Sequence, residues 1–498
     1  MGAAKPRPCL LSPVEMTMDY NLSKVPPFSL LDEPELTFNA DDTAIDVNPL
    51  RGLLRFGAYN GPTFSGYTPE LRVAAIAPVS GWPRLRGLID TVRAGHEAKD
   101  RANYVPAFPG FEGLFKVPLV AAPKEVHIKW PDDLTALGRG GAPHERLFAA
   151  MSDAMARLDA MRDKFDVVLV HLPDKWAPAF NAAGFDAHDA LKALGAKYAI
   201  PTQVINDRVF NFGLKASLAW RLSIALFVKA GGVPWKLAPM KGVPEGTAYV
   251  GLAYALRGDP RAAQFVTCCS QVFDADGGGM QFVAFEARDP VANPQEARRN
   301  PFLSRSDMRA VMARSLSLYL TRNGGRLPRR LVIHKTTSFK DDELRGVFDA
   351  LSTVPEVECI EIGNSATWRG VWLKQSSKPG TRSEPDRAPV PRGTVLIRTG
   401  NSALVWAAGN APSAGLGKPL LYQGGKSIPR PLNIIRHAGS GPLEVAALET
   451  LALTKMDWNN DALYDPVPVT IRYSQKLART IANVPQLPGN HYPYRLFM

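Results

Sequence analysis

The chain has 498 residues, a formal net charge of +12 and a sequence pI of about 9.5. This length allows two or three domains with full cores. Basic residues are spread along the whole chain, which favours a groove for a polyanion over a single basic tail, although a solvated basic surface gives the same composition.

The cysteines point to a reducing compartment. Cys9, Cys268, Cys269 and Cys359 form no CxxC pair and no paired spacing with histidine, so we expect neither a zinc site nor a disulfide framework. The sequence shows no signal peptide, and no apolar run reaches the roughly 18–20 residues that span a bilayer. We therefore expect a soluble, cytoplasmic protein.

The first half of the chain predicts a Rossmann-like, doubly wound α/β domain. Residues 1–45 show little periodicity and are expected to form an N-terminal extension, and RGLLRFGAYNGP (51–62) predicts a short strand and a turn. Strand and helix patterns then alternate, as parallel sheets with crossover helices require. The predicted strands are 71–79, 165–173 and 200–206, and the predicted helices are 82–95, 145–164, a helix around His188, and 217–232.

The pattern changes after the GGVPW segment at 231–235. Three successive apolar strands come first and are followed by alternating helices and strands, which is the order of an RNase H-like domain. The Pro- and charge-rich segment 374–393 predicts an exposed loop. The predicted strands are 247–256, 262–273, 280–289, 329–337, 357–363, 394–400, 403–409 and 418–425, and the predicted helices are 306–323, 340–351, 443–458 and 470–484.

Four polar residues of the first domain form a candidate phosphate pocket. His188 and Lys192 are four residues apart and share one helix face, Gln203 lies in the next apolar run, and Lys229 ends a long apolar helix. Two ammonium groups supply charge and the imidazole and carboxamide supply directed donors, which suits a terminal phosphate. Taken singly, each residue also fits an ordinary role on a solvated helix face, at a strand end or in a helix's last turn.

In this order, the elements and motifs resemble the MID and PIWI domains of an Argonaute. The resemblance rests on the His–Lys–Gln–Lys set, the KAGGVPW junction, the RNase H-like order of strands and helices, and the segments LTKMDWNND and PVTIRYSQKLARTIANV. The resemblance implies an α/β chain in which a Rossmann-like MID domain (46–240) follows the extension at 1–45 and precedes an RNase H-like PIWI domain (241–498). It assigns the four polar residues to the 5′-phosphate of a guide. It also implies a structural Mg²⁺ held there by the C-terminal carboxylate of Met498.

Only a short stretch precedes the MID-like part, and in this respect the chain resembles a short prokaryotic Argonaute. That resemblance implies a heterodimer with a separate APAZ-containing effector protein of TIR, sirtuin or nuclease type. Whether the heterodimer oligomerises on activation stays open, as does its oligomeric state after target binding. The resemblance further implies a guide RNA, a single-stranded target DNA and a role in prokaryotic antiviral immunity. The effector type, the guide length and its 5′ base preference, the choice between RNA and DNA guides and the role of residues 1–45 stay open.

The resemblance places the family's slicing carboxylates at Ala253, Thr336 and Gln475. None of these side chains can replace a carboxylate in holding two Mg²⁺ ions, and Glu286 or Glu296 alone would not suffice. We therefore expect no slicing by this chain. The alternatives are a target-cleaving nuclease of the same fold, a nucleotide-dependent α/β enzyme, for which no Gly-rich loop is found, and a sequence-independent single-strand binder.

Overall fold

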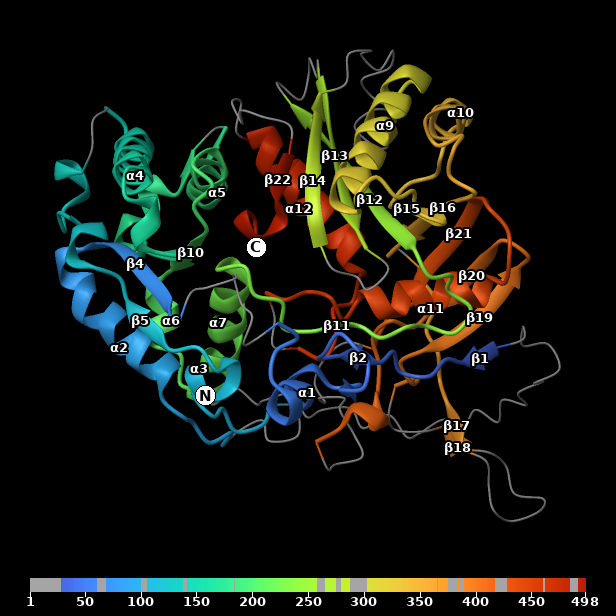
Figure 1. Cartoon of the computed structure of the whole chain (residues 1–498), viewed down its shortest axis with the longest axis horizontal. Coiled ribbons are helices and arrows are strands. Elements are labelled where there is room, and N and C mark those ends of the chain that lie inside the picture. The colour runs from blue at the N-terminus through green and yellow to red at the C-terminus, as the bar shows by residue number, and fades with distance from the viewer. Residues whose placement is uncertain are drawn as a thin grey trace, which may run out of the picture.

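The structure is a computed structural model that describes residues 28–60, 69–99, 105–137, 141–182, 184–257, 265–274, 279–286, 302–364, 366–374, 384–385, 389–416, 428–459, 462–483 and 491–498. Two lobes lie side by side, and the C-terminal end of the chain lies between them (Figure 1). We call residues 69–229 the parallel-sheet lobe and residues 247–498 the mixed-sheet lobe.

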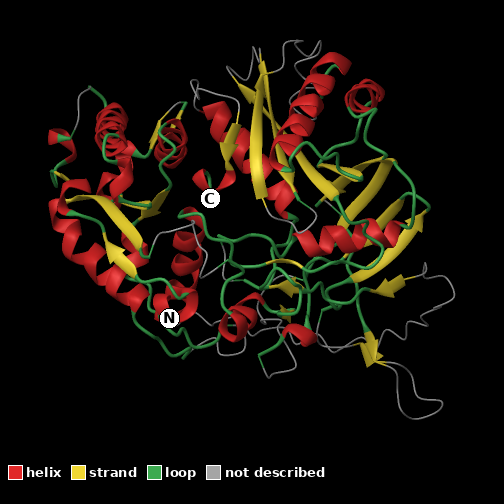
Figure 2. Ribbon diagram, in the orientation of Figure 1, coloured by secondary structure: helices red, strands yellow, loops and turns green. Residues whose placement is uncertain are grey.

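The parallel-sheet lobe confirms the predicted doubly wound sheet. Its strand order is β10-β7-β4-β5, with β6 also paired to β4, and every pairing is parallel. Figure 2 shows helices on both sides of these strands. The elements are β4 (Leu71–Pro78), β5 (Leu119–Ala121), β6 (His127–Trp130), β7 (Val167–His171), β10 (Thr202–Ile205), α2 (Trp82–Arg93), α3 (Phe111–Phe115), α4 (Pro143–Asp159), β8 (Asn181–Ala182), β9 (Phe185–Asp186), α5 (Ala187–Lys197), α6 (Asp207–Phe210) and α7 (Lys215–Lys229).

The apolar strands of this lobe bury both faces. In β4, Ala74 and Ile76 belong to the core that includes Met151 of α4 and Leu191 of α5. Neighbouring residues of the same strand, including Val73, point into the core that contains the apolar residues of α2 and α7. Alternate side chains therefore meet helices on opposite faces, which explains the near-continuous apolar sequence of the strands.

Within the described residues, ten strands of the mixed-sheet lobe and the N-terminal segment form one sheet. Its order is β1-β19-β20-β21-β16-β15-β12-β13-β14-β22, in which β12, β15 and β16 are parallel and the remaining pairings are antiparallel. The strands are β1 (Phe28–Leu30), β12 (Thr247–Arg257), β13 (Phe265–Phe273), β14 (Gly279–Glu286), β15 (Arg330–Lys335), β16 (Glu356–Gly363), β19 (Thr394–Thr399), β20 (Ser402–Val405), β21 (Leu432–Ala438) and β22 (His491–Pro493).

Helices cover both faces of this sheet too. Val250 and Leu252 of β12 belong to the core of α9 (Arg305–Arg322) and α10 (Asp341–Ala350). Tyr249 and Ala253 belong to the core of α11 (Leu443–Leu453) and α12 (Val469–Asn483). The antiparallel strands followed by helix–strand alternation confirm the predicted RNase H-like arrangement. The predicted strand at 418–425 lies outside the described residues.

The predicted strand within residues 51–62 is wrong, because this segment forms helix α1 (Pro49–Phe56). Asn48 caps the helix by accepting hydrogen bonds from the backbone N–H groups of Leu50 and Arg51, and Pro49 occupies the first turn. Gly57 ends the helix with a φ of 80°, which favours glycine. Asn48–Pro49 is thus the local start signal that the strand interpretation overlooked.

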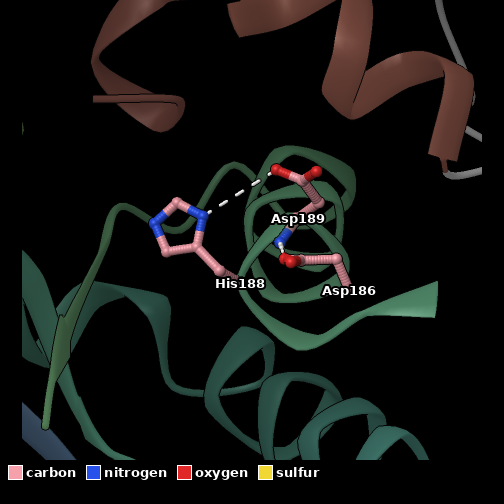
Figure 3. Close-up of side chains that lie close together, drawn as sticks. All are labelled: Asp186, His188 and Asp189. Carbon is pink, nitrogen blue, oxygen red and sulfur yellow. Dashed lines mark hydrogen bonds and ion pairs between the residues drawn. The ribbon is translucent and has the colours of Figure 1, made fainter. Parts of the chain in front are cut away.

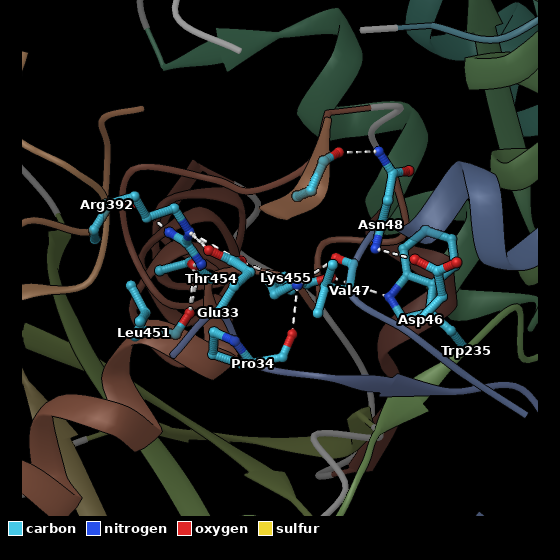
Figure 4. Close-up of polar contacts among 12 residues, drawn as sticks. Glu33, Pro34, Asp46, Val47, Asn48, Trp235, Arg392, Leu451, Thr454 and Lys455 are labelled. Carbon is cyan, nitrogen blue, oxygen red and sulfur yellow. Dashed lines mark hydrogen bonds and ion pairs between the residues drawn. The ribbon is translucent and has the colours of Figure 1, made fainter. Parts of the chain in front are cut away.

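The segment before α1 is joined to the mixed-sheet lobe. β1 pairs with β19, and β2 (Leu36–Thr37) lies between β3 (Ile45–Asp46) and β11 (Lys236–Leu237). A buried charged cluster fixes the segment further (Figure 4): the Glu33 carboxylate accepts from Arg392 Nε at 2.9 Å and lies 3.0 Å from Lys455 Nζ. Lys455 also donates to the carbonyl oxygen of Pro34 at 2.6 Å. Two cations and one carboxylate therefore hold the segment by charge as well as by strand pairing.

A short two-stranded sheet of β17 (Leu373–Lys374) and β18 (Glu384–Pro385) completes the described strands. No helix among the described residues is long and apolar enough to cross a membrane.

Candidate functional site

Asp186 caps the start of helix α5: its side chain accepts a hydrogen bond from the backbone N–H of Asp189 at 2.8 Å. His188 and Lys192 lie four residues apart on this helix. His188 is exposed, whereas the Lys192 side chain is buried toward the C-terminal tail. Gly195 permits the close return of the chain to β10, because a Cβ there would lie 2.7 Å from the carbonyl oxygen of Ile200. The local sequence thus brings Lys192 beside the first residues of β10.

Two lysines from different helices converge on one oxygen. Lys192 Nζ donates to the main-chain oxygen of Met498 at 2.5 Å and to that of Thr202 at 2.8 Å. Lys229, the last residue of α7, donates to the same Met498 oxygen at 3.0 Å. Both lysines are at most 2% exposed, and Met498 is 3% exposed. The predicted pocket lysines are therefore brought together, with the C-terminal tail between them.

The electrostatics of this pocket favour an anion. Burial lowers the pKa of Lys192 well below its usual value, and the charges of Lys229 and Lys476 lower it further. Burial, with the charge of Lys476, lowers the pKa of Lys229 to about 7, against a smaller opposing effect of Asp457. These cations repel one another in a region with little water, and a bound anion would relieve that cost.

His188 and Gln203 share no hydrogen-bond partner with Lys192 or Lys229 among the described residues. The His188 side chain is 46% exposed, and its Nδ1 lies 3.8 Å from Asp189 Oδ1. The hydrogen bond of Asp189 raises the pKa of His188, but partial burial and the nearby Lys192 and Lys476 outweigh it, so the pKa is lowered overall. Gln203 follows Thr202 on β10, and its amide donates to the carbonyl oxygen of Val204 at 3.1 Å. Among the four predicted residues, all of them described, hydrogen bonds bring only Lys192 and Lys229 to a common partner, the main-chain oxygen of Met498.

Two of the three predicted slicing positions lie on neighbouring strands. The last residue pair of β12 and β15 is Leu252 with Lys335, so Ala253 and Thr336 follow directly on neighbouring parallel strands. Gln475 is exposed on α12, which packs against β12. Glu296 and the side chain of Glu286 lie outside the described residues.

No family model matches the sequence. A curated relative, the protein argonaute of Cereibacter sphaeroides, is 22% identical over 461 residues, which cover 88% of this chain and 54% of the relative. Among solved structures, Clostridium butyricum Argonaute bound to a guide DNA and a 19-mer target DNA superposes with a TM-score of 0.66 at 15% identity, over 95% of this chain and 55% of that one. Aquifex aeolicus Argonaute (TM-score 0.57, 15% identity, 94% and 55% coverage) and Drosophila Piwi (0.56, 16%, 94% and 56%) also match.

The chain has an Argonaute fold. It resembles the same family in sequence, and it spans about half the length of the curated relative and of the solved structures it matches.

A histidine and two aspartates of the Argonaute-like α5 region could supply metal ligands. Asp186, His188 and Asp189 place ligand atoms within 4.8 Å of one another (Figure 3). Asp186 already accepts the capping hydrogen bond, and Asp189 accepts from Thr480 Oγ1 at 2.9 Å. Because Lys192 and Lys476 add positive charge nearby, the cluster is better explained as a helix cap and an interhelical contact than as a cation site.

The Mg²⁺ that the resemblance implies has one suitable donor in this pocket, the carboxylate expected at Met498. Three lysines act on the same region, so a divalent cation alone would meet strong repulsion. A guide phosphate would bring both the negative charge and the additional hard oxygen ligands. The residues present therefore fit Mg²⁺ only together with a phosphate, with Met498 as its protein ligand.

A buried ion pair lies at the end of strand β15, between Lys335 and Glu343 of α10. Lys335 Nζ lies 2.6 Å from Glu343 Oε2, and the Tyr254 hydroxyl donates to Glu343 Oε1 at 3.0 Å. Lys335 and Glu343 are both nearly inaccessible. The Glu343 carboxylate is therefore already bound by Lys335, the residue before Thr336, and by Tyr254.

One charged residue that acts on the two pocket lysines was missed by the sequence reasoning. Lys476 of α12 lowers the pKa of both Lys192 and Lys229 through its charge, in addition to the larger effect of burial. It lies next to Gln475, which was noted only as a slicing position. A lysine in a helix of the other lobe gives no local sequence signal, because its proximity to Lys192 exists only in the folded chain.

Proposed function

We propose that this chain binds the 5′-phosphate of a short guide oligonucleotide between its two lobes and pairs the guide with a target strand. The observation that carries the proposal is the convergence of Lys192 and Lys229 on one buried oxygen. A phosphate dianion matches the charge and donor geometry of two ammonium groups better than a neutral ligand does. Sequence recognition would then come from base pairing, while the protein contacts the guide backbone.

The proposed guide is RNA and the proposed target is single-stranded DNA of invading plasmid or phage. The Clostridium butyricum structure contains a guide DNA and a target DNA, which supports nucleic-acid partners for this fold. The choice of an RNA guide rests on the resemblance to short prokaryotic Argonautes. The carboxylate at Met498 would be the protein ligand of a Mg²⁺ bound with the guide, and the ion would supply positive charge to the phosphate.

We further propose that the chain acts in the cytoplasm as the recognition subunit of a prokaryotic immune system. In this proposal, an APAZ-containing effector protein binds the chain, and target pairing activates the effector. Copurification of the chain with the product of a neighbouring APAZ gene tests the partnership, and failure of the two purified proteins to associate would contradict it.

The absence of slicing is part of the same proposal. Ala253, within β12, and Thr336, directly after β15, bring no carboxylate to these two neighbouring strands, and Glu343 is held by Lys335. Among the described residues, this arrangement offers no pair of free carboxylates at these positions. It supports binding without cleavage over the alternative of a target-cleaving nuclease.

The decisive experiment compares guides that differ only at their 5′ end. Equilibrium binding of one RNA sequence with a 5′-phosphate and with a 5′-hydroxyl should show at least tenfold tighter binding of the phosphorylated guide, because each charge-assisted contact contributes about 1.5–3 kcal/mol. Equal affinities would instead indicate a sequence-independent single-strand binder.

A further inference from the structure

Helix α12 of the mixed-sheet lobe lies directly against pocket helix α5. Thr480 Oγ1 donates to Asp189 Oδ1 at 2.9 Å, and both residues are at most 3% exposed. In Figure 3 the Asp189 carboxylate points away from the Asp186 side chain and toward the C-terminal helix drawn in brown. Asp189 lies between His188 and Lys192 in sequence, so the bond fixes α12 beside the pocket.

Lys476 precedes Thr480 by four residues, and the two side chains therefore share one face of α12. The face that contacts Asp189 thus also carries Lys476 toward α5. Lys476 is half-buried, and its Nζ lies 5.9 Å from the centroid of the Tyr473 ring. The electrostatic effect of Lys476 on both Lys192 and Lys229 agrees with this placement.

We propose that Lys476 is a further phosphate-binding group of the pocket and that the Thr480–Asp189 hydrogen bond is the contact that positions it there. This inference rests on the proposed function and adds a residue from the other lobe. The phosphate would then be held by cations of both lobes, Lys192 and Lys229 on one side and Lys476 on the other. Guide binding would therefore strengthen the contact between the lobes, with Asp189 and Thr480 as positioning residues.

Charge-removing variants of α12 test the binding role. Lys476→Met keeps the aliphatic stem, and Arg479→Met is the matched control, because Arg479 is exposed on the same helix and carries the same charge. We expect Lys476→Met to weaken binding of a 5′-phosphorylated guide about tenfold and of the 5′-hydroxyl guide less than about twofold. In Lys476→Met, the slope of the logarithm of the binding constant against the logarithm of the salt concentration should become shallower by about one unit. Lys476→Arg keeps the charge and should retain most of the affinity. Arg479→Met should change the affinity for both guides equally and only slightly.

Variants of the interhelical hydrogen bond test the positioning role. Thr480→Val removes the hydroxyl without changing charge, so we expect about threefold weaker binding of the phosphorylated guide with an unchanged salt slope. Thr480→Ser keeps the donor and should restore wild-type binding. A salt slope that falls in Thr480→Val as it does in Lys476→Met would contradict the separate roles.

Equal losses in Lys476→Met and Arg479→Met would overturn the inference. Amine-reactive footprinting of the unmodified chain gives a check that needs no variant: Lys476 should be protected by the phosphorylated guide and stay reactive with the hydroxyl guide. Unchanged reactivity of Lys476 with both guides would also overturn it. The proposed function fails separately, if the wild-type chain itself shows no preference for the 5′-phosphate.

Discussion

Lys192 and Lys229 lie on different helices and donate to the same main-chain oxygen of Met498, at 2.5 and 3.0 Å. The C-terminal tail reaches this point through β22 and the 3₁₀ turn Tyr494–Leu496. The pocket is therefore assembled from both lobes (Figure 1). Its integrity depends on how firmly the lobes and the N-terminal segment are held together.

The buried cluster of Glu33, Arg392 and Lys455 should dominate the stability of the N-terminal segment. Glu33→Gln leaves two buried cations without their carboxylate, and we expect it to lower the free energy of unfolding by about 3–5 kcal/mol in urea denaturation. Asp349→Asn, which removes the exposed partner of Arg305, is the control and should have a far smaller effect. Equal effects of the two substitutions would contradict this role of the cluster.

His334 should make the protein sensitive to acid. It is 1% exposed, its Nδ1 lies 2.9 Å from Thr470 Oγ1, and burial, with the charge of Arg330, lowers its pKa to about 3. Between that value and the ordinary pKa of about 6.5, the unfolded chain binds one more proton, so stability falls as pH falls through this window.

The slope from this one group reaches about 1.4 kcal/mol per pH unit. His334→Gln removes it, so unfolding free energies measured between pH 6.5 and 4 should decline less steeply in the variant. Parallel pH profiles for the two proteins would show that His334 does not titrate in this range.

Gly251 should be required for the docking of α12. A Cβ at this position would lie 2.0 Å from the carbonyl oxygen of Thr470, which is closer than atoms can approach. Gly251→Ala should therefore displace the start of α12 and lower the melting temperature, and it should weaken guide binding through the displaced Lys476. Gly87→Ala, on the open surface of α2, is the control and should be tolerated. A Gly251→Ala protein as stable as the wild type would contradict this close packing.

The sequence predicted the long central strands, β4, β7 and β10 in one sheet and β12 to β16, β19 and β20 in the other, because continuous apolar runs are local signals. It missed the short strands β5 and β6 of the first sheet and β1 and β22 at the edges of the second. It failed at residues 49–56, where the leucines suited a strand and the Asn48–Pro49 cap was overlooked. It also left out β21, the strand Leu432–Ala438 that lies beside β16.

The candidate pocket likewise contains residues that the sequence could predict and residues that it could not. Lys192 and Lys229 could be proposed from their spacing and from the family resemblance, because each sits at a recognisable position in a helix. The approach of Lys476 and the Thr480–Asp189 bond could not, since residues far apart in sequence meet there only after both lobes have packed.

Purified chain alone should leave a guide-matched target intact in Mg²⁺ or Mn²⁺. In the proposed assignment, Ala253, Thr336 and the exposed Gln475 stand where carboxylates would have to hold two metal ions, and none of the three side chains is a carboxylate. Gel analysis of labelled target after long incubation measures this, with a slicing Argonaute as the positive control. Cleavage that Glu286→Ala abolishes would show that a carboxylate set exists after all.

The most direct measurement of the central claim is guide binding by the Lys192→Met/Lys229→Met double variant, with Lys197→Met, an exposed lysine of α5, as the control. Methionine keeps the buried volume while removing the charges. The account predicts that the double variant binds 5′-phosphorylated and 5′-hydroxyl guides with equal, weak affinity, while the control keeps the wild-type preference. A double variant that still prefers the phosphorylated guide by tenfold would place the phosphate elsewhere and contradict the account.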